Sequence, residues 1–114
     1  MNTDKKNFLG FSGGGNFAID YAFKQIVPVS GLILNCPGVP DVSDSSITAY
    51  AKNGRRLGIV TGEWDWALND QKELLSRVRK ADGIHRITIN EGIGHQFSSD
   101  FSSLLDEYLI WIND

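Results

Sequence analysis

Hydrophobic and polar residues follow two spacings along this chain. Short apolar runs bounded by turn residues are typical of buried strands, whereas apolar residues at every third or fourth position are typical of amphipathic helices. The predicted strands are Asn7–Phe11, Leu32–Leu34, Arg56–Thr61 and Ile84–Ile89. The predicted helices are Asn16–Gln25, Ser45–Lys52, Asn69–Lys80 and Ser99–Trp111. This alternation predicts an α/β fold of three layers, in which a mostly parallel sheet of about four strands has helices on both sides.

Each long helix has a predicted inner face. In the first helix it comprises Phe17, Ala18, Tyr21 and Ala22, with Ile26 just beyond. In the third helix it comprises Leu68, Gln71, Leu74, Leu75 and Val78. In the last helix it comprises Phe101, Leu104, Leu105, Tyr108 and Ile112. We expect these faces to cover the sheet.

The carboxyl ends of the strands are where open parallel sheets place their chemistry. Four segments follow predicted strands and are expected to meet at that edge. They are the Gly-rich turn at Ser12, then 35–38, 62–66 and 91–96. The other connections are expected to be structural.

Composition narrows the class of protein. With 114 residues, the chain is long enough for one domain, which we assign to 1–114. A net charge of −3 argues against binding to nucleic acid. Its apolar runs are too short to span a bilayer, so no membrane partner is expected. The first residues lack the apolar core of a signal peptide, which favours the cytoplasm if Met1 is the natural start.

A single cysteine, Cys36, excludes an intrachain disulfide and a Cys-rich metal site. It follows an apolar run, so a buried structural thiol is the expected role. We expect no metal at this or any other position.

The segment Gly13–Ala18 (GGGNFA) fits the G-x-G-x-x-A pattern of a dinucleotide-binding turn after a first strand. That pattern also requires an acid at the end of the second strand, where it binds the ribose. Here the second strand is followed by Asn35 and Cys36, and the next acid is Asp41. The phosphate-binding interpretation therefore lacks one of its partners.

The overlapping segment GFSGG fits G-x-S-x-G, the pattern of a serine nucleophile on a sharp strand-to-helix turn. Gly10 and Gly14, two positions on either side of Ser12, would give clearance where strand and helix converge. The backbone N–H of Gly13 would point at a developing oxyanion. A plain Gly-rich turn is the simpler alternative, so the interpretation depends on finding a base and an acid.

Two histidines are available as the base that a serine nucleophile needs. His95, in GIGHQF, directly follows the fourth predicted strand. Gly92 and Gly94 leave room for its ring to reach a neighbouring strand end. His85 lies inside the strand, away from the carboxyl edge, and is expected to be a surface or packing residue.

Three acids follow the third predicted strand, in TGEWDWALND. Asp65 lies at the tip of the loop and is the first choice to orient His95, with Glu63 second. Asp70 falls in the first helical turn, where an acid stabilises the N-terminus. The predicted order along the chain is thus Ser12, Asp65, His95, which is the α/β-hydrolase order.

Together, GFSGG, TGEWD and GIGHQF resemble the nucleophile elbow, acid loop and histidine loop of serine α/β-hydrolases, in the esterase, carboxylesterase and prolyl-oligopeptidase-like group. The resemblance is to the C-terminal half of the fold and covers essentially the whole chain. It implies hydrolysis of small-molecule carboxylic esters, without a cofactor, through an acyl-enzyme. Ser12 would be the nucleophile, His95 the base, Asp65 the acid and Gly13 an oxyanion donor.

The same family carries further strands before the elbow and a second oxyanion donor in an HGGG-type loop. This chain begins a few residues before the elbow strand, so we expect a truncated and weakly active hydrolase. The alternative is a noncatalytic oligomerising or binding half-domain with the same fold. Either way, the first strand would have an unpaired edge for a missing N-terminal half or a second copy.

Two tryptophans, Trp64 and Trp66, flank the predicted acid. They either pack in the core, as large apolar residues usually do, or line a hydrophobic substrate pocket. The short connection over 37–54 is small for a lid, which favours small soluble esters.

Overall fold

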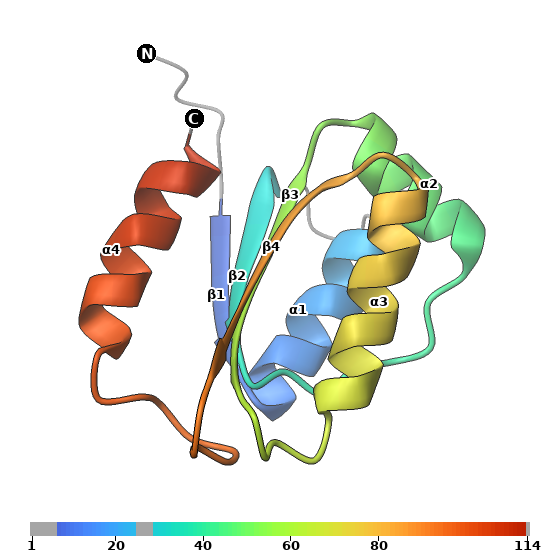
Figure 1. The fold of residues 1–114 in the computed structure, drawn as a ribbon. Helices are drawn as coiled ribbons and strands as arrows, with labels where there is room; N and C mark the ends of the chain where they lie inside the picture. Colours follow the sequence, from blue (N-terminus) through green and yellow to red (C-terminus); the bar gives the residue numbers. More distant parts are fainter. Residues whose placement is uncertain (1–6, 25–28, 114) are drawn as a thin grey trace.

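The computed structural model describes residues 7–24 and 29–113, in which strands and helices alternate (Figure 1). The strands are β1 (Asn7–Phe11), β2 (Gly31–Asn35), β3 (Arg56–Gly62) and β4 (Ile84–Asn90). The helices are α1 (Gly13–Phe23), α2 (Asp44–Lys52), α3 (Leu68–Lys80) and α4 (Phe101–Ile112). All eight predicted elements are therefore present in the predicted order.

The four strands form one parallel sheet in the order β1-β2-β3-β4. The register aligns their carboxyl ends, because Phe11 pairs with Asn35, Asn35 with Val60, and Val60 with Thr88. The predicted parallel α/β sheet is confirmed.

Helices cover both faces of the sheet, as Figure 1 shows. Helices α1, α2 and α3 lie on one face, where Ile19, Phe23 and Tyr50 are buried in the larger core. Helix α4 covers the other face, where Tyr108 and Ile112 form a smaller core with residues of β2 and β3. The long stretches of buried residues in β2 and β3 follow from this double cover.

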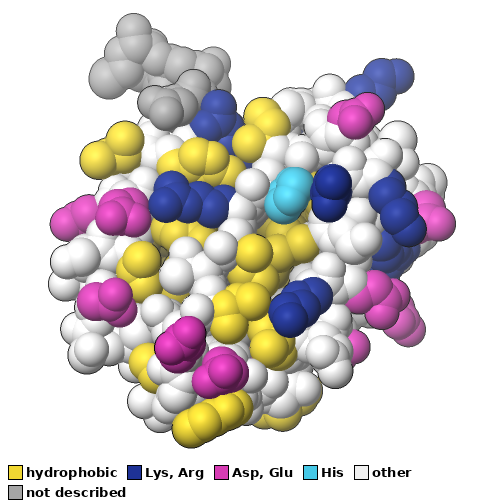
Figure 2. Space-filling view, in the orientation of Figure 1, with side chains coloured by type: hydrophobic (Ala, Val, Ile, Leu, Met, Phe, Trp, Pro, Cys, Tyr) yellow, Lys and Arg dark blue, Asp and Glu magenta, His cyan; other side chains and the backbone are white. Residues whose placement is uncertain are grey.

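The two edge strands expose part of their apolar surface. Leu9 of β1 is 58% exposed, and Ile84 and Ile89 of β4 are 41% and 38% exposed. Figure 2 shows hydrophobic side chains along the middle of the face on which Figure 1 places β4. Within the described ranges, β1 pairs only with β2, so its other edge has no strand beside it.

Helix α1 differs from its prediction in start and in inner face. It begins at Gly13, and its buried residues include Ala18, Ile19 and Phe23, while Phe17 is 64% exposed. The predicted inner residue Tyr21 is also exposed, whereas Ala18 and Ala22 are buried as predicted, so that stripe is half confirmed and half wrong. The low helix propensity of glycine made the first turn look like loop. The buried face includes Ile19 and Phe23, which the predicted stripe left out.

Smaller differences affect the other bounds, mostly by one or two residues, as is usual where helices and strands fray. The last helix begins at Phe101 rather than Ser99. The predicted inner residues of α3 and α4 are all at least half-buried. The predicted ends at Gln25 and Ile26 lie outside the described residues. None of the helices in the described ranges has the length and apolar character needed to cross a membrane.

Candidate active site

The carboxyl ends of the four strands lie along one edge of the sheet, at the bottom of Figure 1. Ser12 follows β1, Cys36 follows β2, Asp65 follows β3, and His95 lies beyond β4. These segments are the ones that the sequence assigned to this edge. The structure brings three of their side chains into one hydrogen-bonded row.

Ser12 occupies a sharp turn between β1 and α1. Its φ of 54° and ψ of −117° are unusual for a residue with a side chain, and such backbone strain is typical of functional positions. Serine at a helix N-cap usually accepts a hydrogen bond from the helix, but this side chain makes none. Its Oγ lies instead 2.7 Å from Nε2 of His95.

Helix α1 begins directly after Ser12, at Gly13. The first N–H groups of a helix have no partner within it, and they carry the positive end of its dipole. The N–H of Gly13 belongs to this group and is placed next to the serine in sequence. A developing negative charge at Ser12 would therefore meet a helix N-terminus.

Close packing behind the turn occurs at two glycines, but not at the predicted pair. A Cβ on Gly10 would lie 2.9 Å from Gly15 Cα, and one on Gly15 would lie 2.8 Å from Pro37 Cβ. A Cβ on Gly14 would meet nothing within 4 Å. The clearance predicted for Gly10 is confirmed and that for Gly14 is wrong, because Gly15 is the α1 residue that faces β1.

His95 is held between Ser12 and Asp65. Its Nδ1 is hydrogen-bonded to Oδ1 of Asp65, and its Nε2 faces the Ser12 hydroxyl. An ionised carboxylate only accepts, so Nδ1 carries the proton and Nε2 of the neutral ring is left as an acceptor. The side chain of Asp65 is fully buried, while that of His95 is 26% exposed. Solvent can thus reach the imidazole but not the acid.

The second oxygen of Asp65 has two further donors. Gln71 Nε2 lies 2.8 Å from Oδ2, and the N–H of Ala67 lies 3.3 Å from it. The predicted second choice, Glu63, is exposed and accepts from the N–H of Gly92 instead. Asp70 is exposed in the first turn of α3, as predicted. Only Asp65 of these acids contacts His95.

The loop that carries His95 is tied to the ends of the two central strands. The N–H of Trp64 donates to Ile93 O at 3.0 Å. The Asn35 amide and the Cys36 thiol both reach the Gln96 carbonyl, at 3.4 and 3.5 Å. These bonds position the loop over the carboxyl ends of β2 and β3, which brings His95 to Ser12.

Cys36 lies beneath this loop and is completely buried, as predicted. Burial raises the pKa of its thiol, although a hydrogen bond with Thr61 acts in the opposite direction. Ligand-type atoms of Cys36, Asp65 and His95 all lie within 4.8 Å of one another. Within this group, the carboxylate of Asp65 and the imidazole of His95 are hydrogen-bonded to each other.

Aromatic rings flank the imidazole. The ring centroids of Phe11 and Trp66 lie 5.6 and 5.7 Å from that of His95. Trp64 and Trp66 are 70% and 73% exposed, so the packing role that was one alternative for them is wrong. Phe11 was missed as a neighbour of His95, because nothing in the sequence pairs it with a loop so far along the chain.

His85 lies on β4 and its Nδ1 is 3.2 Å from Gly83 O. It is half-buried and has no contact with Ser12 or Asp65. The expectation of a packing or surface residue is confirmed.

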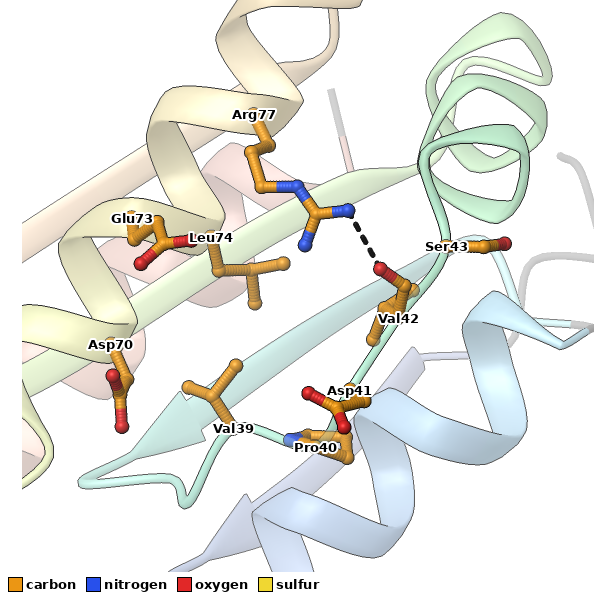
Figure 3. A pocket seen from close by; sticks show the side chains of 9 residues that line it. All are labelled: Val39, Pro40, Asp41, Val42, Ser43, Asp70, Glu73, Leu74 and Arg77. Carbon is orange, nitrogen blue, oxygen red and sulfur yellow. Dashed lines mark hydrogen bonds between the residues drawn. The ribbon is translucent and has the colours of Figure 1, made fainter.

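Of two cavities on the described surface, one lies beside the candidate active site and the other lies away from it. One of about 290 Å³ adjoins the serine turn and is mostly apolar, with Gly10, Phe11, Asn35 and Phe97 among its lining residues. The other, of about 490 Å³, lies between the 39–43 connection and α3, as Figure 3 shows. It is bordered by acidic side chains and by Arg77, whose Nη2 donates to Val42 O. No residue of the Ser12 row lines this second cavity.

Comparison with known proteins adds a structural likeness. No protein-family model and no curated protein sequence matches the chain. A protein described as uncharacterised from Bacillus cereus ATCC 10987 superposes with a TM-score of 0.90 at 19% identity, over 97% of this chain and 38% of that one. The Bacillus cereus carboxylesterase superposes with a TM-score of 0.70 at 20% identity, over 94% and 48%. MGS-M1, an α/β-hydrolase enzyme from a Medee basin deep-sea metagenome library, superposes with a TM-score of 0.77 at 16% identity. That superposition covers 99% of this chain and 55% of MGS-M1.

The likeness establishes the fold. The chain has a partial α/β-hydrolase fold: a parallel sheet with flanking helices, whose structural neighbours include esterases and α/β-hydrolases. It spans about half the length or less of the three solved structures just described. The family predicted from the three motifs is therefore matched at the level of fold.

Proposed function

We propose that the protein is a serine hydrolase that cleaves carboxylic esters through an acyl-enzyme. The observation that carries the proposal is the hydrogen-bonded row from Ser12 Oγ through His95 to Asp65, assembled at the carboxyl edge of the sheet. The strained backbone of Ser12 and its helix N-terminus are consistent with a nucleophile. The fold of the chain is one on which esterases are found.

In the proposed reaction, Nε2 of His95 removes the Ser12 proton while Oγ attacks the ester carbonyl carbon. The carbonyl oxygen becomes an oxyanion, which the Gly13 N–H stabilises at the start of α1. His95 then gives its proton to the leaving alcohol, and the acyl group stays on Oγ. A water that His95 deprotonates releases the acid and restores the serine. Asp65 remains ionised throughout and stabilises the transient imidazolium.

We propose slow ester turnover for the described residues alone. Among them we assign one oxyanion donor, the Gly13 N–H, and the loss of one donor from such a site typically costs about 10²–10³ in turnover. The exposed ring of Trp66 lies beside His95 and is the proposed contact for the substrate. The short 37–54 connection favours a small soluble ester.

An activity-based probe tests the proposal without knowledge of the substrate. A fluorophosphonate forms a phosphorus–oxygen bond to an activated serine as fluoride leaves, and we expect it to label Ser12. Ser12→Ala should abolish labelling, while Ser102→Ala, which alters an exposed serine of α4, should leave it unchanged. Absence of label from folded wild-type protein would refute an activated serine.

The alternative is a noncatalytic half-domain that binds a partner or a second copy through β1. It is favoured by the unpaired edge of β1, by the exposure of Leu9, and by the apolar cavity beside them. An unpaired edge presents N–H and C=O groups that pair readily with another strand. This function predicts an oligomer that Leu9→Lys disrupts, no ester turnover above background, and indifference to His95→Ala.

A further inference from the structure

Gln71 is the one polar residue among the buried residues of α3. Its side chain is completely buried, and the other buried positions of the helix are Leu74, Leu75 and Val78. Burying an amide is costly unless it is hydrogen-bonded. The sequence placed Gln71 on the inner face only as a packing residue, but its contacts are with the candidate active site.

The amide nitrogen of Gln71 donates to two acceptors. Nε2 lies 2.8 Å from Oδ2 of Asp65 and 2.9 Å from the carbonyl oxygen of Pro37. An amide NH₂ has two hydrogens, so both bonds can form at once. The amide oxygen, Oε1, has no hydrogen-bond partner among the described residues. The two bonds of Nε2 therefore determine how the amide is oriented.

The Pro37 segment is itself joined to the serine turn. The N–H of Gly38 donates to the carbonyl oxygen of Ser12 at 3.3 Å, and Pro37 packs directly against Gly15 of α1. A closed ring of contacts therefore runs from Ser12 to His95, Asp65, Gln71, the 37–38 segment and back to Ser12.

We propose that Gln71 is a positioning residue, which holds the Asp65 carboxylate toward His95 and fixes the acid loop relative to the serine turn. Its role in catalysis rests on the proposed function. The other donor to Oδ2, the Ala67 N–H at 3.3 Å, comes from the same loop as Asp65. Among the described residues, Gln71 is the one whose hydrogen bonds join that carboxylate to the segment behind Ser12.

Gln71→Met is the first test, because it keeps the length of the side chain and removes both donors. We expect the fluorophosphonate labelling rate of Ser12 to fall by about 10- to 100-fold, as small misplacements of reacting groups cost that much. The Nδ1–H proton resonance of His95, measured by NMR in the folded protein, should weaken or exchange faster with water. An unchanged resonance would overturn the proposal, whether or not the wild type labels.

A double-mutant cycle distinguishes positioning from a general packing effect. In an Asp65→Asn background, adding Gln71→Met should change the labelling rate little, because the carboxylate on which Gln71 acts is gone. A loss equal to that in the wild-type background would overturn the proposal. Wild-type protein that does not label would refute the proposed function, and the His95 resonance would then decide the role of Gln71 alone.

Gln71→Glu gives a second variant with a different readout. When neutral, the new carboxyl still has an O–H that can donate to Asp65, whereas the ionised form repels that carboxylate. The ratio of its labelling rate to that of the wild type should therefore fall as the pH rises. A ratio that stays constant with pH in folded protein would contradict the proposal.

Discussion

His95 Nε2 lies 2.7 Å from Ser12 Oγ although 83 positions separate the two residues in the chain. The two follow strands at opposite edges of the sheet, since β1 and β4 have β2 and β3 between them. Neighbouring strands are about 4.8 Å apart, so the loop after β4 must run back over two strand ends. Hydrogen bonds from Trp64, Asn35 and Cys36 to carbonyl oxygens of this loop hold it over those strand ends.

The first prediction concerns the hydrogen-bonded residues Ser12, His95 and Asp65. His95→Ala and Asp65→Asn should each lower the fluorophosphonate labelling rate of Ser12, and any ester turnover, by several orders of magnitude. The expected loss is about 10⁴-fold, because the serine loses its base or the base loses its orientation. His85→Ala is the matched control and should label as the wild type does. Equal loss in both histidine variants would point to unfolding rather than chemistry.

The second prediction concerns the contact between the acid loop and the histidine loop. A Cβ on Gly62 would lie 2.1 Å from Ile93 O and 2.4 Å from Gly94 O, so Gly62→Ala must displace the histidine loop. We expect Ser12 labelling to be lost and the free energy of unfolding to fall by about 1–3 kcal/mol or more.

Gly94→Ala is the control for this change, since its added Cβ meets nothing within 4 Å. Denaturant unfolding and labelling should both remain near wild type. Full activity of Gly62→Ala would show that the loop is less closely held than its contacts indicate.

A third prediction compares two glycines of the serine turn. Gly10→Ala would press β1 against Gly15, and overpacking of this kind typically costs about 1–3 kcal/mol. Gly14→Ala adds a methyl group to open space in the first turn of α1 and should be neutral or stabilising by up to about 1 kcal/mol. Urea denaturation of the two variants measures both effects, and the reverse order would contradict the assigned packing.

The fourth prediction separates the two exposed tryptophans. Trp66→Ala removes the ring next to His95 and should raise KM for a small aryl ester more than it lowers kcat. Trp64 is equally exposed but has no ring contact with His95 among those described, so Trp64→Ala should change neither constant appreciably. Equal effects of both substitutions would remove Trp66 as a substrate contact.

The fifth prediction follows from the buried hydroxyl of Tyr50. Burial raises its pKa well above the ordinary value of 10.0, so the folded state keeps this proton after the unfolded state has lost it. Its contribution to stability is complete below about pH 10 and is lost as the pH rises toward the folded pKa. The free energy of unfolding should then fall by up to about 1.4 kcal/mol per pH unit.

Denaturant unfolding measured from about pH 8 to about pH 11, on both sides of the ordinary tyrosine pKa, checks how steeply the free energy of unfolding falls with pH. The raised pKa of the Cys36 thiol acts in the same direction from its ordinary value of 9.0 upward. Tyr50→Phe is the comparison. This variant should be less stable at neutral pH, but its free energy of unfolding should change less with pH above about pH 10, because it lacks the ionising group. A slope as steep as that of the wild type would exclude Tyr50 as its source.

Much of the fold could be predicted because the strongest signals in the sequence are local. The apolar runs of β2 and β3 are bounded by turn residues, and the stripe of α3 keeps its spacing through Val78. The phase of α1 could not be read in the same way. Phe17 and Tyr21 are apolar enough to suggest a buried face, but they pack against each other on the outside of the helix.

The candidate site was predicted in part, through motifs that each lie within a few residues. Strand ends and chain order point to Ser12, Asp65 and His95, and the structure places them in contact. They do not point to Gln71 and Gly62, because the roles of these two residues depend on segments that meet only in three dimensions. A glutamine within an apolar helical stripe was the available signal for Gln71.

The order of the strands in space is also their order in the sequence, and this has a consequence for folding. Each strand pairs with the strand made just before it, so the sheet can grow one strand at a time in the order of the chain. The contact between Ser12 and His95 is different, since it joins the turn after β1 to the loop after β4. The reactivity of Ser12 is therefore expected to appear only when the final loop has docked, and it would report completion of the fold.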